Sequence, residues 1–562
     1  NTAQNGGVSF HGDVDFENFT FTTISSYRSS NTQRDGDIDF TSVDLISGNQ
    51  QDIQIDTFTQ ELRLASNGDN RFHWLVGGFY FNENIDQTDN VTFGTAFRSF
   101  VNLLADPTGA TDTLSGLEFA LGLPIGTTFH QPGQGVFEVA TQDNQSFSLF
   151  GQFDFDLTER LTATFGVSYV NDRKDVTLSQ INTDLFSQLD FVGIGFAGLF
   201  GAFTGGAAPT PANFALFPGQ TAAAAAAATT PCTPTSAPGS CNTALALQAL
   251  QFLPALLGIP SSGENGQSRD ENVDFTLRLA YDWTDNVNVY ASYATGYKAT
   301  SWNLSRDSRP TNAELDAVFG VAVPGLFGLA RPGQPATLVA ATRRADPEEA
   351  FVYEVGLKAS FARGSFNVTV FDQTLENFQS NVFNGVAFTL ANAQQQSVQG
   401  VEFDLLWFAT DNLSFGLAGT FLDPVFDEFT NSTFGDVSGT RPGGIHGTSL
   451  STRVNWNWQS GSYDGFVRAD YQYDSDVSVQ GGGTINAANA ILAAVGQDRR
   501  SVNTFNASTG ISKNNWDLTF YGRNIFNDEF LGASFATTAQ PGSFSGYPNQ
   551  PRTYGVLLRK NF

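Results

Sequence analysis

Apolar and polar residues alternate with a period of two along most of this chain. Residues 273–281 alternate strictly between apolar side chains and Asp, Thr, Arg or Ala, and residues 467–474 and 516–521 repeat the pattern. Successive side chains of a β-strand point to opposite faces of a sheet, so the pattern predicts strands with one apolar, aromatic face and one polar face. In the first of these segments the apolar face carries Val273, Phe275 and Leu277.

The connections between these predicted strands alternate between short and long. Short polar turns lie at residues 66–70, 158–159, 284–286, 363–364, 410–412, 460–461 and 513–515. Long connections lie at roughly 87–143, 176–270, 301–348, 428–446, 478–501 and 527–552. Structureless loops of this length are uncommon in compact soluble domains, whereas outer-membrane barrels join short periplasmic turns to long extracellular loops.

The pattern therefore favours an all-β fold, a transmembrane antiparallel β-barrel whose long extracellular loops contain short helices. In hydrocarbon every backbone group needs a partner, so a membrane sheet has to close on itself, with lipid against its apolar face. A soluble propeller or β-helix is the alternative, but no fixed repeat of about 40 residues supports it.

Residues 191–208 are the most apolar stretch; they are rich in glycine and predict a loop rather than a spanning helix.

Composition and charge exclude several classes of function. Acidic residues outnumber basic ones by 56 to 28, and a net charge of −28 repels nucleic-acid phosphates. With 41% hydrophobic and 13% aromatic residues, the chain is not intrinsically disordered. None of the four histidines lies beside a recognisable nucleophile motif, so no enzymatic activity is predicted.

The two cysteines, Cys232 and Cys241, lie nine positions apart in a segment rich in Pro, Ser and Thr. A metal site at the pair is the alternative, but no histidine is nearby, and no cysteine–histidine cluster has zinc spacing. A local disulfide in an extracellular loop is the favoured interpretation, and it implies an oxidising compartment.

Several phrases resemble the barrel of TonB-dependent outer-membrane receptors. They are residues 59–66 (TQELRLAS), 293–298 (YATGYK), 347–349 (PEE), 353–358 (YEVGLK), 392–393 (NA), 400–402 (GVE) and 522–527 (GRNIFN), with Phe562 as a terminal aromatic assembly signal. Their order extends over about 500 residues. The resemblance implies a 22-stranded barrel around an N-terminal plug, located in the bacterial outer membrane and without a cofactor.

Seventeen strands are predicted: pairs beginning near 8/19, 56/70, 144/160, 271/286, 349/364, 385/412, 447/462 and 502/515, then 553–562. The first strand would run from the outside inward. We therefore expect residues 1–562 to be a receptor barrel that lacks the plug and about the first five strands, with residues 176–270 as a long extracellular insertion. A complete odd-stranded barrel of the mitochondrial type is the alternative.

Two groups of residues are candidate binding sites. Trp302, Asn303 and Arg306 follow a predicted strand at the extracellular mouth, where they would stack on and hydrogen-bond a ligand. Equally, Trp302 would suit an aromatic girdle, and Arg306 a lipopolysaccharide phosphate.

Asp35, Asp37 and Asp39 have the alternate spacing of a calcium loop, but the expected twelfth-position Glu is replaced by Ile46, so a solvated acidic loop is the competing interpretation.

The resemblance implies active uptake of a scarce nutrient: a ferric siderophore or similar chelate, cobalamin, haem or an oligosaccharide. The implied partners are the TonB complex, reached through the plug, together with outer-membrane lipid and lipopolysaccharide. A passive porin and a structural or adhesive outer-membrane protein are the alternatives. The apolar loop segments, such as residues 222–228 and 243–257, predict either small folded cores over the barrel, or an exposed apolar surface that binds an apolar ligand or contacts a partner protein.

Overall fold

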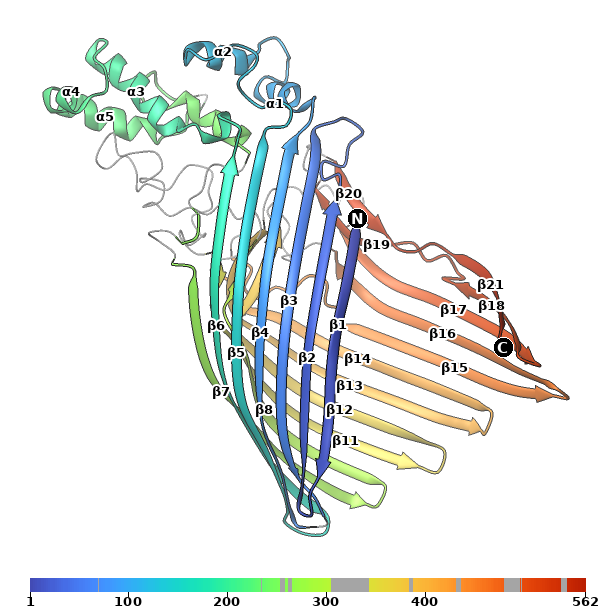
Figure 1. The fold of residues 1–562 in the computed structure, drawn as a ribbon. Coiled ribbons are helices and arrows are strands. Elements are labelled where there is room, and N and C mark those ends of the chain that lie inside the picture. Colours follow the sequence, from blue (N-terminus) through green and yellow to red (C-terminus); the bar gives the residue numbers. More distant parts are fainter. Residues whose placement is uncertain are drawn as a thin grey trace.

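A computed structural model describes the chain except for residues 69, 234, 253–257, 261–264, 305–342, 384–387, 431–435, 480–495, 497, 537–542 and 562. One antiparallel sheet of 17 strands dominates it (Figure 1). Its strands are β1 (Thr2–Asp15), β2 (Phe19–Asp35), β3 (Ile46–Ser66), β4 (Phe72–Phe93), β5 (Gly135–Asp156), β6 (Leu161–Asn182), β7 (Gln267–Thr284), β8 (Val287–Lys298), β11 (Glu348–Phe361), β12 (Gly364–Phe383), β13 (Phe388–Thr410), β14 (Leu413–Glu428), β15 (Thr448–Ser460), β16 (Tyr463–Ser478), β17 (Arg499–Lys513), β18 (Trp516–Arg523) and β21 (Thr553–Lys560).

The number of strands and their hairpin pairing confirm the sequence prediction. Several strands are longer than predicted at their loop ends: β3 begins at Ile46 rather than near 56, and β5 at Gly135 rather than near 144. The apolar alternation fades there, yet the backbone ladder continues through polar residues. The long connection that follows β6 accordingly comprises residues 183–266.

Neighbouring strands pair in chain order from β1 to β21, including β8 with β11, and Figure 1 shows the sheet curling between these two ends. Among the described residues, β1 pairs only with β2, and β21 pairs only with β18. Two short ladders lie apart from the main sheet, β9 (Ser301–Trp302) with β10 (Arg344–Ala345) and β19 (Leu531–Ala536) with β20 (Phe544–Pro548). The wall therefore has two free edges.

The short turns are set by residues that tolerate unusual backbone angles. Between β17 and β18, Asn514 and Asn515 have φ values of 47° and 65°, and the flanking Lys513 and Trp516 pair directly. Asparagine is among the few residues that adopt this left-handed region readily, and two such residues form the tight turn whose twist suits a hairpin. This turn fixes the register between the last strands.

Burial on the sheet is the inverse of that in a soluble protein. On β7 the apolar side chains of Val273, Phe275 and Leu277 are 44%, 42% and 51% exposed. The intervening polar residues Asp274 and Thr276 are less exposed than these and are half-buried. The apolar stripe continues to Tyr281, about 27 Å along the strand at ~3.4 Å per residue. With the usual tilt, this matches the apolar band of a membrane barrel. The predicted lipid-facing side of β7 is thus an exposed apolar surface.

This arrangement makes a substitution test possible on one strand. Leu277→Arg is expected to destabilise the protein by about 2–4 kcal/mol, because it places a charge near the middle of the apolar band. Thr276→Arg, on the opposite face, is the matched control and should cost much less. Folding titrations in lipid vesicles measure both. Equal costs for the two variants would contradict the assignment of the faces.

Helices occur in the long connections after β4 and β6 (Figure 1). They are α1 (Phe97–Ala105), α2 (Thr113–Ala120), α3 (Phe191–Thr204), α4 (Pro211–Leu216) and α5 (Pro218–Ala228), with two 3-10 helices, η1 (Phe186–Gln188) and η2 (Thr243–Leu250). Among the described residues, no helix is long and apolar enough to cross a bilayer. We call residues 94–134 and 183–252 the extracellular cap.

A single apolar core joins the two halves of the cap. It includes Phe97 and Leu114 from the first loop and Phe186, Phe196 and Phe200 from the second. The seven-alanine run lies in α5, where three of its residues are buried. The loops therefore form a folded core, as one of the two interpretations predicted.

As expected, the described residues of segment 191–208 form no membrane-spanning helix, but the loop contains a short helix here. α3 occupies Phe191–Thr204, and the Asp190 side chain caps it by accepting a hydrogen bond from the Val192 backbone. Burial of its phenylalanines in the cap core offsets the unfavourable helix propensity of its glycines. Helix propensity alone does not include this tertiary contribution.

Candidate functional site

The residues predicted at the extracellular mouth are only partly described. Trp302 is 8% exposed and Asn303 6%, and Arg306 lies outside the described residues. The Trp302 indole Nε1 donates to Ser268 Oγ at 3.1 Å, and its ring packs with a small apolar cluster that includes Ile259. Trp302 is thus covered by the inner wall rather than open to solvent, and ligand contact by this trio stays a prediction.

Around Trp302 the inward face of the wall carries a dense polar network. Asp270 on β7 accepts hydrogen bonds from the backbone and hydroxyl of Thr300 at 3.0 and 3.1 Å. Gln379 on β12 accepts from Ser301 Oγ at 2.6 Å and donates to two backbone carbonyls. These contacts fasten the segment after β8 to the inner wall beneath the mouth.

A buried ion pair between Asp172 and Lys174 lies on the same inward face of β6. Carboxylate, ammonium and amide groups in one place suit a polar, hydrogen-bonding solute better than an apolar one. Sequence reasoning did not single out these side chains. The alternation of the strands indicates which residues face inward, but it does not distinguish these side chains from the other inward-facing polar residues.

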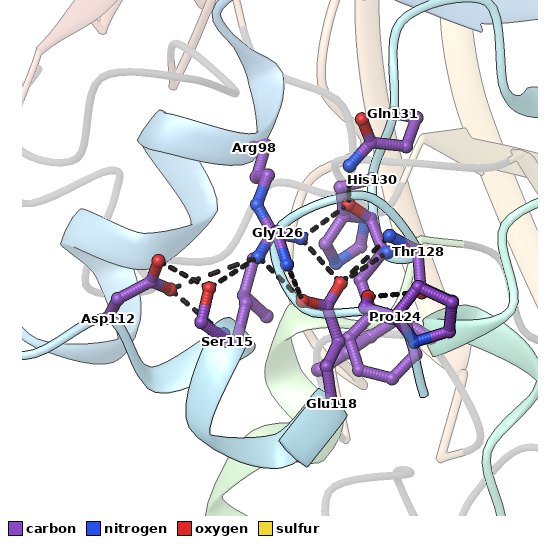
Figure 2. A network of polar contacts seen from close by, with 12 residues as sticks. Arg98, Asp112, Ser115, Glu118, Pro124, Gly126, Thr128, His130 and Gln131 are labelled. Carbon is purple, nitrogen blue, oxygen red and sulfur yellow. Dashed lines mark hydrogen bonds and ion pairs between the residues drawn. The ribbon is translucent and has the colours of Figure 1, made fainter. Parts of the chain in front are cut away.

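The first half of the cap is organised by one charged pair (Figure 2). Glu118 is fully buried, and its two carboxylate oxygens accept hydrogen bonds from Arg98 Nη1 and Nη2 at 2.9 and 3.1 Å. The same carboxylate accepts backbone N–H groups of Gly126, Thr128 and Phe129. Burial raises the pKa of Glu118, but these hydrogen bonds outweigh it and hold the pKa below its usual value.

A second buried pair joins the two halves of the cap. His130 and Asp184 are both fully buried, with His130 Nδ1 3.1 Å from Asp184 Oδ2. Asp184 also accepts the backbone N–H of His130 at 2.9 Å and the Ser187 hydroxyl at 2.8 Å. Burial raises the pKa of Asp184. The hydrogen bonds and charge of His130, together with the hydrogen bond from Ser187, lower the pKa by more than burial raises it, so it lies below the ordinary value of 3.8.

A pH dependence of the cap follows from the lowered pKa of Asp184. Its contribution to stability is fully present above the ordinary value of 3.8 and is lost as the pH falls through the lower folded value. The protection of residues 183–189 against hydrogen exchange, relative to the intrinsic rate at each pH, should therefore fall below about pH 4. Because Glu118, Asp112 and Asp106 also have lowered pKa values, Asp184→Asn is the control: it should weaken the junction at pH 7 and reduce the acid response. An unchanged acid response in that variant would refute the assignment.

The candidate calcium loop forms a hydrogen-bonded turn. Asp37 accepts the backbone N–H of Asp39, and Asp39 accepts from Thr41 and Ile46 at 2.8 and 2.9 Å. Asp35 ends β2. Among the described residues, no group of three or more His, Cys, Asp or Glu is arranged to hold a metal ion. These turn contacts account for Asp37 and Asp39, and calcium binding stays a prediction.

Two further predictions concern the cysteines and the C-terminus. The disulfide between Cys232 and Cys241 is confirmed, and it closes the loop after α5 within the cap. Phe562, the predicted assembly signal, lies outside the described residues. The strand before it keeps its alternation, with Tyr554, Val556 and Leu558 61–65% exposed.

An apolar outer face, a polar inner face, short turns at one end and a folded cap at the other are the features of the wall of an outer-membrane β-barrel. The family model described as TonB dependent receptor-like, beta-barrel matches residues 1–525. The chain belongs to this family, and it is an outer-membrane protein.

Solved structures share the fold at low sequence identity. The ferric yersiniabactin uptake receptor FyuA from Yersinia pestis is 16% identical with a TM-score of 0.62, over 100% of this chain and 61% of that protein. The siderophore receptor PiuA from Acinetobacter baumannii is 14% identical (TM-score 0.56; 99% and 64%). The copper transporter OprC is 11% identical (TM-score 0.54; 100% and 65%). The chain thus spans less than two thirds of each of these proteins.

Proposed function

We propose that this chain is the barrel of a receptor that takes up a scarce nutrient across the outer membrane with energy from TonB. The observation that carries the proposal is the polar inner wall beneath a folded extracellular cap, in a chain of the TonB-dependent receptor family. Such a wall offers hydrogen-bonding groups along a path through the barrel, and the protein acts as a transporter, without an enzymatic step.

A ferric siderophore or a similar metal chelate is the substrate class that we favour. One structural relative is named a siderophore receptor and another a ferric yersiniabactin uptake receptor. A polar chelate would suit the hydrogen-bonding groups around Asp172, Lys174 and Asp270. The copper transporter among the relatives shows that the fold alone does not decide the cargo. Cobalamin and oligosaccharides stay within the proposed range.

We further propose that the wall is completed by about five more strands and the lumen by a plug that contacts TonB. The support is the pair of free edges at β1 and β21, which a bilayer does not tolerate. Inward-facing ion pairs on the first strands, such as Glu61 with Arg63 at 3.1 Å, give the plug a polar surface to contact.

Conductance of the natural protein in a planar bilayer tests this function against the passive porin. A plugged receptor should be nearly silent, and a porin of similar diameter is the positive control. Steady, large conductance would overturn the receptor proposal. Mass spectrometry of ligand retained from iron-limited cells then tests the favoured substrate class: a retained ferric chelate supports it, and an oligosaccharide or cobalamin in its place rejects the chelate as the substrate.

A further inference from the structure

A groove lies on the lipid-facing side of the wall and extends over strands β11 to β14. Its volume is about 930 Å³, and its lining includes Tyr353 and Val355, which are 58% and 62% exposed. Residues directly opposite one another on paired strands share a face, so the lining comprises two rows of outward residues and one inward row between them. The groove therefore opens toward the membrane.

The outward row nearer the short turns is apolar. In register across four adjacent strands stand Val355, Val370, Val401 and Phe421. Val370 is 55% exposed and Phe421 46%, so hydrocarbon covers this row in a membrane. The three adjacent valine side chains are shorter than that of Phe421, and the surface is hollowed where they lie.

The outward row nearer the extracellular loops is polar. In register stand Tyr353, Asp372, Gln399 and Asp423. On β12, β13 and β14 the outward residues thus change from apolar to polar at the same register position. Such a change, with an exposed tyrosine beside it, is typical of the level at which the hydrocarbon of a bilayer meets its headgroups. A lipid chain along the valines would place its headgroup at this row.

The two carboxylates of the polar row differ in their surroundings. Asp423 lies 4.0 Å from Arg441 Nη2, which balances its charge. Asp372 Oδ2 accepts a hydrogen bond from Gln399 Nε2 at 2.8 Å, and within the described part of the chain no cation pairs with Asp372. Asp372 stands directly opposite Tyr353 on the same face. A carboxylate beside an exposed aromatic ring suits a ligand cation, because charge attraction and cation–π attraction act on the same group.

We propose that this groove binds a glycerophospholipid with a primary ammonium headgroup, of the phosphatidylethanolamine class. Its ammonium group contacts Asp372 and Tyr353, and one acyl chain lies along Val370 and Val401. The occupant is a lipid because the groove opens on the apolar side of a membrane wall. The headgroup follows from the charge of Asp372, which an ammonium group complements and an anionic headgroup does not. The site is independent of the transported substrate.

Lipid titration monitored by native mass spectrometry tests the proposal on protein purified from native membranes. The probes are phosphatidylethanolamine and phosphatidylglycerol with the same acyl chains, and the first should bind more tightly. Near-surface attraction is about fivefold per unit charge, so Asp372→Asn should weaken phosphatidylethanolamine binding about fivefold without weakening that of phosphatidylglycerol. Asp372→Glu keeps the charge and should keep the preference. Val401→Trp fills the groove and should weaken the binding of both lipids.

Asp404→Asn is the matched control, because Asp404 also accepts hydrogen bonds from a side-chain amide, that of Asn367 at 3.0 Å, but lies on the inward face of β13. It should keep the lipid preference of the unmodified protein. Equal affinity of the unmodified protein for the two lipids, or an equal loss in the Asp404 control, would overturn the proposal. So would a dimer that dissociates in Val401→Trp, since a second copy of the chain would then occupy the groove.

Discussion

Residues 1–562, produced behind a heterologous signal peptide with no further wall strand, are expected not to form a sealed barrel in the outer membrane. The reason is the free edge of β1, whose outward groups from Val8 to Asp15 would face lipid without partners. About four N–H and four C=O groups are involved, and each costs on the order of several kcal/mol in hydrocarbon. Their sum exceeds a typical net stability of ~5–15 kcal/mol.

Heat-modifiable migration and protease resistance in the outer membrane measure this assembly, with a complete receptor barrel of the same family as the positive control. Supplying the proposed further strands as a separate chain should restore assembly if pairing with the edges of β1 and β21 is what the wall needs. Efficient assembly of residues 1–562 as a sealed, conducting monomer would reject the prediction. It would favour the odd-stranded barrel instead.

Glu118→Ala is expected to unfold the first half of the cap while the barrel wall stays intact. The substitution leaves the Arg98 guanidinium, whose side chain is only 15% exposed, without its closest carboxylate, so that only the exposed Asp112, at 3.9 Å, remains near it. It also removes the acceptor of three backbone N–H groups. Removing one partner of a buried ion pair costs about 3–5 kcal/mol. Limited proteolysis and hydrogen exchange over residues 97–134 should both increase, without a change in heat-modifiable migration.

Two variants separate the buried charge from general damage to the cap. Replacing both partners, Arg98→Met with Glu118→Leu, removes the unpaired charge and should recover much of the lost protection. Asp175→Ala breaks the ion pair with Arg173, whose side chain is 50% exposed, and should have little effect. If Glu118→Ala behaves like Asp175→Ala, the pair does not hold the cap together.

The strands and their pairing order were accessible from the sequence because both depend on local information. Alternation along residues 273–281 reports which side chains share a face, and turns such as Asn514–Asn515 join strands that are adjacent in the chain. Because each strand pairs with the strands that precede and follow it in the chain, the pairing order does not depend on contacts between distant parts of the sequence. The same local signal weakens above the membrane, which is why the loop ends of β3 and β5 were placed about ten residues too late.

The candidate site was much less predictable than the wall. Trp302 follows a strand as expected, but its burial depends on Ser268 and Ile259, which come from other segments. The Arg98–Glu118 and His130–Asp184 pairs join positions 20 and 54 residues apart within or between loops. Nothing in the local pattern distinguishes these charges from solvated ones.

By itself, then, the sequence determined a many-stranded membrane wall, its lipid-facing side and the local disulfide between Cys232 and Cys241, because neighbouring residues carry each of these features. Only the tertiary structure decided that two distant loops share one core, that Glu118 is buried against Arg98, and that Tyr353, Asp372 and Gln399 lie in a single row. The physical reason is register. Alternation tells which face a side chain occupies, whereas the hydrogen-bonded pairing of strands and the packing of helices decide which side chains meet on that face.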